Sequence, residues 1–279
     1  MFEIYPPSNI LQPFIAFFYN LKCHKVDYAN IISEFCVPSG FGHMGFHLRG
    51  SFYMIQKNQR RELQRFYTTG QQTHHYFFNS DSDKVDLYGV TFKPTGLWHL
   101  FGVDMQTITD KSIETNFLLK DNIQSFIEQF DSEQEFSTRV QLIEDLLIFA
   151  FLKAQPQLNL VDSAIQKINQ TYGCVSIKEL AYNLGISKRY FQKKFKRMVG
   201  ITPTSYRRIV RFNFMFADIK TDVPIDCNTL SALYNYHDLS HFSKDFKRYC
   251  GICPSKFHIS KFNFLQELIA LKVMHTTYL

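Results

Sequence analysis

The densest group of charged side chains is a run of cations from Lys188 to Arg197. Six of these ten residues are Lys or Arg, as expected of a surface that neutralises phosphates. The wider segment 161–260 holds 16 basic and 7 acidic residues, a net charge of +9, whereas residues 1–160 carry −4. A charge run can also be an ordinary solvated helix face, so charge alone leaves that alternative open beside nucleic acid.

Histidine pairs offer a second candidate chemistry, metal binding. His43 and His47 lie four residues apart, and His74 and His75 are adjacent. Two histidines at these spacings do not make the HxH, Glu and His set that cupin metals use. His241 could serve as a base or ligand, but beside Phe242 a structural or phosphate-facing role is the simpler interpretation.

The six cysteines are scattered, and only Cys250 and Cys253 form a CxxC pair. A lone pair lacks the further ligands of a zinc site, so we expect reduced thiols. The sequence also contains no Ser/His/Asp, nucleophile-elbow or phosphate-loop pattern. It therefore predicts no metal, no cofactor and no enzyme activity.

Length and composition predict two folded domains. The chain has 279 residues, 45% apolar and 20% charged, which is typical of a protein that buries a core in each of two domains. The N-terminus lacks the basic segment of a signal peptide. The most apolar stretch, 142–152, contains Glu144 and Asp145 and is too short to span a bilayer. We therefore expect a cytoplasmic protein with no membrane partner.

Helix boundary signals surround the basic run. Ser176 and Glu179 form a capping box that begins one helix, and Gly185 ends it. Ser187 can cap a second helix from Lys188 to about Val199, which closes at a glycine. A short helix, a glycine turn and a second helix with a basic outer face predict a helix-turn-helix unit.

A longer helix follows, and then the pattern repeats. Thr202 and Pro203 supply a cap and a first-turn proline for a helix through roughly Lys220. A shift of 51 residues superposes 195–197 (Phe-Lys-Arg) on 246–248, and 200–203 on 251–254. The second turn is one residue longer, with Asn235 where the first has Gly185, and Asn tolerates positive φ. The second unit then continues in a recognition helix from Leu239, capped by Asp238, to about Cys250.

At this point the segment resembles the AraC/XylS transcription regulators. The resemblance covers about residues 162–260 and is carried by three stretches. They are Ile177-Lys-Glu-Leu-Ala-Tyr-Asn-Leu-Gly-Ile-Ser; Phe191 to Phe195-Lys-Arg with Gly200-Ile-Thr-Pro; and Ser240-His-Phe to Phe246-Lys-Arg with Gly251-Ile-Cys-Pro. It implies a seven-helix domain in which the helix from Pro203 holds two reader helices in adjacent major grooves. Three positions depart from the family pattern, namely Ser231, Asn235-Tyr236 and Cys253, and we expect slightly poorer packing in the second unit.

Helical geometry then assigns side chains to the DNA. If Phe191 and Phe195 face the core, the opposite face points outward. The predicted base-contacting residues are Lys188, Arg189, Gln192 and Lys193 in the first reader, and Leu239, Ser240, Ser243 and Lys244 in the second. The predicted phosphate-contacting residues are Ser187, Tyr190, Lys196, Arg197, Arg207, His241, Lys247 and Arg248, with Lys194 and Arg208 of the same kind. Because the first reader is more cationic, we expect it to supply more of the affinity.

The N-terminal part alternates apolar and polar residues in short runs between Glu34 and Phe92, as in 46–49, 65–67 and 85–92, which predicts strands of a β-barrel or sandwich. Val37-Pro-Ser-Gly, and Tyr88-Gly-Val-Thr-Phe-Lys-Pro-Thr-Gly with the following Leu97, Leu100 and Phe101, resemble the cupin-like sensor domain of one branch of the same family. This looser resemblance covers residues 5–120. A 3.6-residue periodicity returns from Asp121 to Lys153 and predicts helices.

The predicted class is therefore α+β with two domains. Residues 1–120 form a β-rich cupin-like sensor domain with flanking helices, and 121–160 a helical connector with a linker at 155–159 and a dimer contact. Residues 161–260 form an all-α domain of two helix-turn-helix units joined by a long helix, and 261–279 an amphipathic helical tail that covers the DNA-binding domain or a second subunit.

We interpret the chain as a sequence-specific DNA-binding transcription regulator that responds to an effector. The expected partners are double-stranded DNA, RNA polymerase, an unknown small-molecule effector and a second copy of the chain. Activation and repression both stay open. The alternatives are a metal-dependent cupin-type enzyme fused to a DNA-binding module, and a nonspecific DNA binder.

Overall fold

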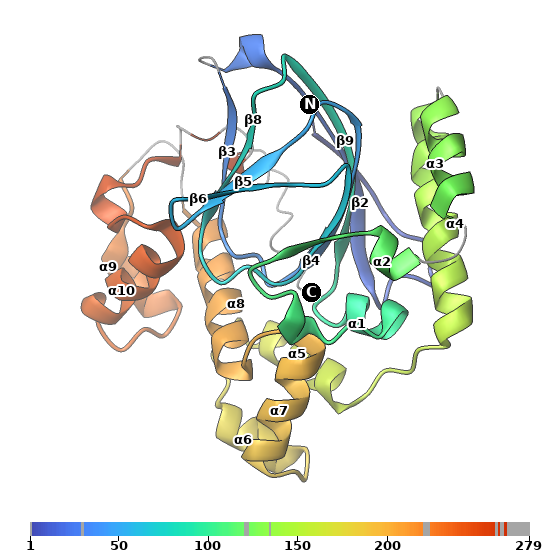
Figure 1. Cartoon of the computed structure of the whole chain (residues 1–279). Helices are drawn as coiled ribbons and strands as arrows, with labels where there is room; N and C mark the ends of the chain where they lie inside the picture. Colours follow the sequence, from blue (N-terminus) through green and yellow to red (C-terminus); the bar gives the residue numbers. More distant parts are fainter. Residues whose placement is uncertain are drawn as a thin grey trace.

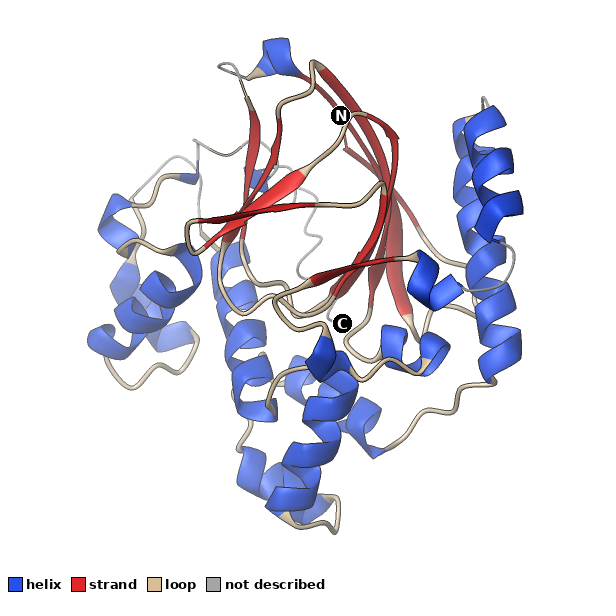
Figure 2. Cartoon of the chain, in the orientation of Figure 1, coloured by secondary structure: helices blue, strands red, loops and turns tan. Residues whose placement is uncertain are grey.

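The computed structural model describes residues 2–266, apart from 29–30, 120–122, 134, 220–223, 260–261 and 263–264. Within these residues the N-terminal part is built mainly from two β-sheets and the C-terminal part from helices (Figures 1 and 2). The predicted α+β class with two domains is therefore confirmed. No helix in the described part of the chain is long and apolar enough to cross a membrane.

Two antiparallel sheets face each other in the N-terminal domain, which the sequence predicts to be a sensor domain. The larger contains, in spatial order, β1 (Phe2–Tyr5), β2 (Ile15–His24), β9 (Lys84–Phe92), β4 (Gly42–Arg49), β7 (Phe66–Thr69) and β10 (Ser112–Glu114). The smaller contains β3 (Ile32–Cys36), β8 (Tyr76–Ser80), β5 (Tyr53–Gln56) and β6 (Gln59–Glu62). The three runs predicted as strands coincide with β4, β7 and β9. The long strand β2 lies before the range in which the sequence predicted strands. It was not recognised because Asn20 interrupts its apolar pattern; this side chain is buried, and its amide donates to Asp86.

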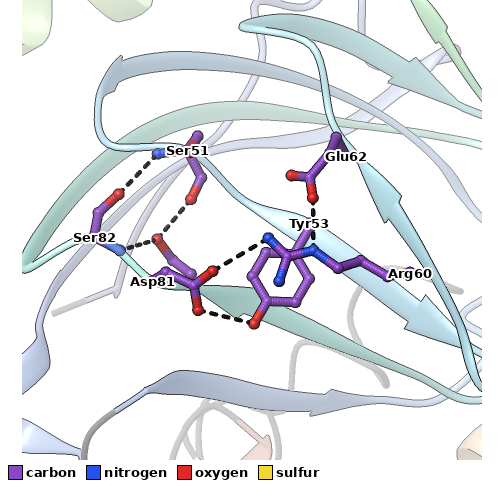
Figure 3. Close-up of polar contacts among 7 residues, drawn as sticks. Ser51, Tyr53, Arg60, Glu62, Asp81 and Ser82 are labelled. Carbon is purple, nitrogen blue, oxygen red and sulfur yellow. Dashed lines mark hydrogen bonds and ion pairs between the residues drawn. The ribbon is translucent and has the colours of Figure 1, made fainter.

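Edge strand β6 is tied to the turn between β8 and β9 by the cluster in Figure 3. The Arg60 guanidinium lies 3.5 Å from the ring centroid of Tyr53 and contacts the carboxylates of Glu62 at 2.6 Å and Asp81 at 3.2 Å. The Tyr53 hydroxyl donates to the same Asp81 at 3.0 Å. A charged edge of this kind resists pairing with a strand of another molecule.

In the part of this half that the structure describes, the α-helices are α1 (Gly96–Phe101), α2 (Asn116–Leu119), α3 (Ile123–Ser132) and α4 (Phe136–Ala154). The last two confirm the helical periodicity predicted from Asp121 to Lys153. They lie side by side, away from the C-terminal helices (Figure 1). Phe126 and Phe130 of α3 pack on Phe46 of β4, so the pair covers one face of the larger sheet.

The C-terminal helices are α5 (Leu160–Gln170), α6 (Ile177–Asn183), α7 (Lys188–Val199), α8 (Pro203–Ala217), α9 (Cys227–Leu233) and α10 (Leu239–Cys250). In the described residues the next helical turn is the 3-10 helix η3 (Pro254–Lys256). The predicted bounds of both recognition helices are confirmed. The helix predicted from Pro203 to about Lys220 is shorter in the structure, since α8 ends at Ala217 with Asp218 as its C-cap. Lys220 lies outside the described residues.

The predicted turn chemistry is also present. Gly185 has φ +66° and Asn235 has φ +51°, so both turns pass through the left-handed region. The Ser176 hydroxyl accepts from the backbone N–H of Glu179 at 3.4 Å, which is the serine half of the predicted capping box. The full reciprocal box occurs instead at Asn159 and Asp162, at the start of α5.

One apolar core joins the two halves of the molecule. Phe35, Val37 and Phe41 of the sensor domain belong to the same buried cluster as the helices of the C-terminal domain. Leu265, from the predicted tail, is also in that cluster, and the Phe262 ring stacks on Phe35 at 4.8 Å. The tail was expected to cover the DNA-binding domain or a second subunit, but these two residues also reach the sensor domain; 267–279 lie outside the described residues.

Candidate nucleic-acid interface

The first reader helix, α7, is anchored by one apolar face. Phe191 and Phe195 are fully buried, and their rings meet edge to face at 5.6 Å. The Ser187 hydroxyl caps the helix by accepting from the backbone N–H of Tyr190 at 3.2 Å. On the opposite face Lys188, Arg189 and Lys193 are exposed and Gln192 is half-buried. The structure thus gathers the four predicted base-contacting residues on one accessible face.

The second reader helix, α10, repeats this arrangement with fewer charges. Phe242 and Phe246 are fully buried, and Asp238 caps the helix by accepting from the backbone N–H of His241 at 2.7 Å. The outward residues predicted to contact bases are Leu239, Ser240 and Lys244, which are exposed, and Ser243, which is half-buried. Lys244 is the only cation among these four.

A buried ion pair joins α8 to α10 in the second unit. Arg211 of α8 and Asp245 of α10 lie 3.1 Å apart, with side chains 6% and 7% exposed. The same guanidinium lies 3.9 Å from the ring centroid of Tyr236 and donates to the backbone carbonyl of Asn235 at 3.5 Å. Asn235-Tyr236, one of the three departures from the family pattern, therefore contacts a buried cation. Of the other two, Ser231 is buried and Cys253 makes no side-chain cap at η3.

The predicted phosphate-contacting residues fall into two groups. Ser187, Tyr190, Lys196, Arg197, Lys247 and Arg248 are exposed, whereas Arg207 and His241 are half-buried. Arg207 already donates to the carbonyl of Gly173 at 3.3 Å, and burial lowers the pKa of its guanidinium. Arg197 lies 3.9 Å from the Asp104 carboxylate of the sensor domain. Arg207 and Arg197 therefore make contacts within the protein, and their predicted contacts with phosphates stay a prediction.

Both reader helices dock their C-terminal ends on the sensor domain. At the end of α7 the carbonyl of Gly200 accepts from the Thr109 hydroxyl at 3.0 Å, and a Cβ at Gly200 would lie 2.9 Å from the carbonyl oxygen of Met105. At the end of α10 a Cβ at Gly251 would lie 2.5 Å from the His75 ring. The N-terminal ends, where a recognition helix presents its base-reading residues, are left exposed (Figure 1).

Three further polar contacts join the two halves. The Asn213 amide on α8 donates to the Pro38 carbonyl at 2.8 Å. Asp162 on α5 lies 3.0 Å from the ring nitrogen of His99 and accepts from the Thr95 hydroxyl at 2.6 Å. Burial alone would raise the pKa of Asp162, but these hydrogen bonds hold it below its ordinary value. Pro38, Thr95, Gly200 and Gly251 stand in motifs that the sequence analysis quotes, but no sequence pattern predicted that they contact the other half of the chain.

The candidate metal residues are dispersed. No group of three or more His, Cys, Asp or Glu side chains suited to a metal ion occurs among the residues that the structure describes. Burial lowers the pKa of both His43 and His47 to about 4, and His74 and His75 lie in the loop before β8. Cys250 is buried and Cys253 is exposed, and both thiols are free.

Comparison with known proteins gives a match in each half. Residues 180–258 match the family described as a helix-turn-helix domain, over the segment that holds α7, α8 and α10. The helix-turn-helix character predicted for the C-terminal domain is therefore confirmed. Residues 3–114, which hold both sheets, match the family described as a domain of unknown function (DUF6597).

Among curated relatives, the raffinose operon transcriptional regulatory protein RafR from Pediococcus pentosaceus is 31% identical over 112 residues. That match covers 39% of this chain and 38% of RafR. Among solved structures, ToxT from Vibrio cholerae has a TM-score of 0.45 at 12% identity over 86% of this chain and 96% of ToxT. The AraC-like transcriptional activator CuxR has a TM-score of 0.27 at 14% identity over 76% of this chain and 85% of CuxR.

Proposed function

We propose that this chain is a sequence-specific DNA-binding transcription regulator that inserts α7 and α10 into adjacent major grooves. The observation that carries the proposal is the arrangement of the two readers. Each buries one aromatic face, rests its C-terminal glycine against the sensor domain and exposes its N-terminal reading face. A recognition helix reads base edges from its N-terminal residues. The domains are taken as residues 1–120, 121–160, 161–260 and 261–279, as predicted from the sequence.

Base reading is assigned to the eight residues that the two exposed faces present. In α7, Arg189 and Lys193 suit guanine, and Gln192 suits adenine; in α10, Leu239 suits a thymine methyl. The exposed cations Lys196, Lys247 and Arg248 are assigned to phosphates, which fix position but carry no sequence information. RNA polymerase is the protein partner that a regulator of this kind implies, and the cytoplasm is the proposed location.

The test is an electrophoretic shift of the full chain with DNA from upstream of its own gene, competed by a scrambled duplex of equal length. We expect the native duplex to bind at least about a thousandfold more tightly than the scrambled one at physiological salt. Equal competition would establish a nonspecific binder instead. Metal analysis of the same preparation completes the test, because stoichiometric metal with no DNA retention would favour the cupin-type enzyme.

We propose in addition that the regulator responds to a small-molecule effector bound between the two sheets. A cavity there is lined by residues of the sensor domain together with Asn213 of α8, the helix that joins the two readers. A ligand that contacts both halves has a direct physical route to the readers, because it can favour one packing of α8 over another. The check is DNA affinity measured with and without a ligand that binds this cavity.

We propose a homodimer through the helical connector. Phe149 and Leu152 on α4 are 51% and 60% exposed, and Phe117 beside them is 68% exposed. Apolar side chains gathered in this way are typical of an interaction surface, and a second copy of this chain is the proposed occupant. Phe149→Arg is expected to shift the chain to monomer in sedimentation, whereas an unchanged mass would remove α4 from the interface.

A further inference from the structure

The two reader helices rest on different segments of the N-terminal domain. Gly200, at the end of α7, contacts Thr109 in the segment 104–110, which leads into β10 of the larger sheet. Gly251, at the end of α10, lies against His75, which directly precedes β8 of the smaller sheet. Each reader is therefore supported by a different sheet, and the placement of one reader relative to the other depends on what joins these two segments.

The side chain of Asp110 joins the two segments. One carboxylate oxygen accepts from the backbone N–H of Thr73 at 2.7 Å, and the other accepts from the Thr73 hydroxyl at 2.6 Å. Asp110 directly follows Thr109, which contacts the end of α7. Thr73 lies two residues before His75, which contacts the end of α10. These two hydrogen bonds, called the Asp110 link below, thus complete a short path between the ends of the two readers.

The backbone on both sides of the Asp110 link fits this contact. Asp110 has φ +54°, in the left-handed region that Asp and Asn tolerate better than most residues. Its backbone N–H donates to the carbonyl of Gln71 at 2.9 Å, and its carbonyl accepts from the Arg61 guanidinium of β6. A Cβ at Gly70 would lie 2.5 Å from the carbonyl oxygen of Ile108. The two segments can therefore approach this closely only because position 70 lacks a side chain.

The Asp110 link restricts how the two readers move relative to each other. Along the chain the readers are joined by α8, and the Asp110 link joins them a second time through the N-terminal domain. Two linked binding modules reinforce each other only when the linkage lets both engage the target at once, and geometry that is fixed before binding lowers the entropic cost of binding. Hydrogen bonds to a carboxylate are among the stronger ones. The link is therefore suited to fix the distance and orientation between α7 and α10.

We propose that Asp110 is a positioning residue that fixes the spacing of the two readers, so that both fit one bipartite DNA site. It acts through Thr109 on α7, and through Thr73 and His75 on α10, rather than by contact with DNA. The readout on DNA rests on the proposed function, whereas the link between the readers is a property of the protein alone. Loss of the link is expected to reduce discrimination between half-site spacings, because both reading faces stay unchanged.

The test is competition binding of the full chain to three duplexes that carry both half-sites intact. One has the native spacing, and the other two have one base pair inserted or deleted between the halves, which turns one half by roughly 35° about the DNA axis. We expect the wild-type chain to prefer the native spacing. Asp110→Gly accommodates positive φ and removes the carboxylate, and we expect it to lower this preference by at least about fivefold. An equal preference in the wild type and the variant would overturn the proposal.

The ratio of affinities separates positioning from stability, because a smaller folded fraction weakens binding to all three duplexes alike. Thr73→Val removes the hydroxyl from the other end of the link and keeps the backbone N–H, so we expect a smaller fall in the ratio than in Asp110→Gly. The control is Asp81→Gly, which removes another carboxylate of the same domain, one that accepts from the Tyr53 hydroxyl (Figure 3). We expect this control to leave the ratio unchanged. An equal fall in Asp81→Gly and Asp110→Gly would contradict the assignment.

A measurement without DNA separates this inference from the proposed function. Spin labels attached through keto-bearing residues at the exposed positions Lys188 and Leu239 report the distances between the two reading faces. We expect a narrow distribution of distances in the wild-type chain and a broader one in Asp110→Gly, and equal widths would overturn the inference. Failure of the wild-type chain to prefer its upstream duplex would instead remove the regulatory function and leave the difference in widths intact.

Discussion

The two helix-turn-helix units share one sequence pattern, but different interactions hold their second helices in place. In the first, an apolar face of phenylalanines anchors α7, and its outer face carries a dense set of exposed cations. In the second, α10 has a similar apolar face but is also fixed by the buried pair of Arg211 and Asp245. At the position of Asp245 the first unit has the half-buried Lys194. The first unit thus concentrates charge on its exposed outer face, whereas the second also buries a charged pair in its interior.

The largest expected difference comes from that buried pair. Asp245→Ala leaves the Arg211 guanidinium buried without its carboxylate, and we expect it to lower the free energy of unfolding by about 3–5 kcal/mol. Lys194→Ala, the matched change in the first unit, is expected to stay within about 0.5 kcal/mol because it breaks no buried contact. Urea denaturation of both variants is the measurement. Equal losses would mean that the second unit has no special electrostatic anchor.

The two glycines that end the reader helices come next. Both have positive φ, +95° at Gly200 and +79° at Gly251, so alanine at either costs about 1–2 kcal/mol of backbone strain. At Gly200 the new Cβ also meets the backbone carbonyl of Met105, whereas at Gly251 its three nearest atoms all belong to the His75 side chain, which can move more easily than backbone. We therefore expect Gly200→Ala to cost about 1–3 kcal/mol more than Gly251→Ala. Thermal unfolding compares them, and a larger cost at Gly251 would contradict the docking described for α7.

A third pair tests base reading. Arg189→Ala is expected to cost about 1–3 kcal/mol of binding to the preferred duplex and to relax preference at one base pair. Ser240→Ala removes the matched residue of α10 and is expected to cost about 1 kcal/mol or less, because a neutral hydrogen bond is weaker. Competition assays with single-base variants of the duplex give both values. If Arg189→Ala weakened cognate and scrambled duplexes alike, its assignment to bases would fail.

The smallest expected effect concerns phosphates. Lys196 and its matched residue Lys247 are both exposed, and each alanine variant is expected to reduce the slope of log Kd against log salt by about 1. Neither should change sequence preference. Titration at several salt concentrations measures the slope, and a change for Lys196 without one for Lys247 would place the second reader farther from the DNA backbone.

The local pattern of the C-terminal domain was readable from sequence because helix caps and turns are short-range chemistry. Ser187, Asp238 and the positive-φ positions Gly185 and Asn235 act within four residues of themselves, so their roles follow from spacing. The pairing of Arg211 with Asp245 joins residues 34 apart. Several arrangements of the helices satisfy the same periodicity. Such a contact can therefore be predicted only when the tertiary packing is known.

Less of the predicted sensor domain could be inferred from sequence, because its structure depends on contacts between distant residues. Its strands alternate, but nothing in the sequence states that Tyr19 and Tyr67 lie over Gly89 and Gly45, because strand register is set by distant partners. The contacts that dock this domain on the two readers, such as Thr109 with Gly200, likewise come from loops without a pattern.

The central claim is that two reader helices of unequal strength bind one DNA site. The most direct test is an equilibrium competition assay between DNA duplexes, and the reference duplex is chosen by mapping the sites that the full chain binds. We expect a bipartite site whose halves lie about one helical turn apart. Scrambling either half should lower affinity, and the cost should be larger for the half read by α7. A site with only one informative half, or a scrambled duplex that competes as well as the native one, would contradict this account.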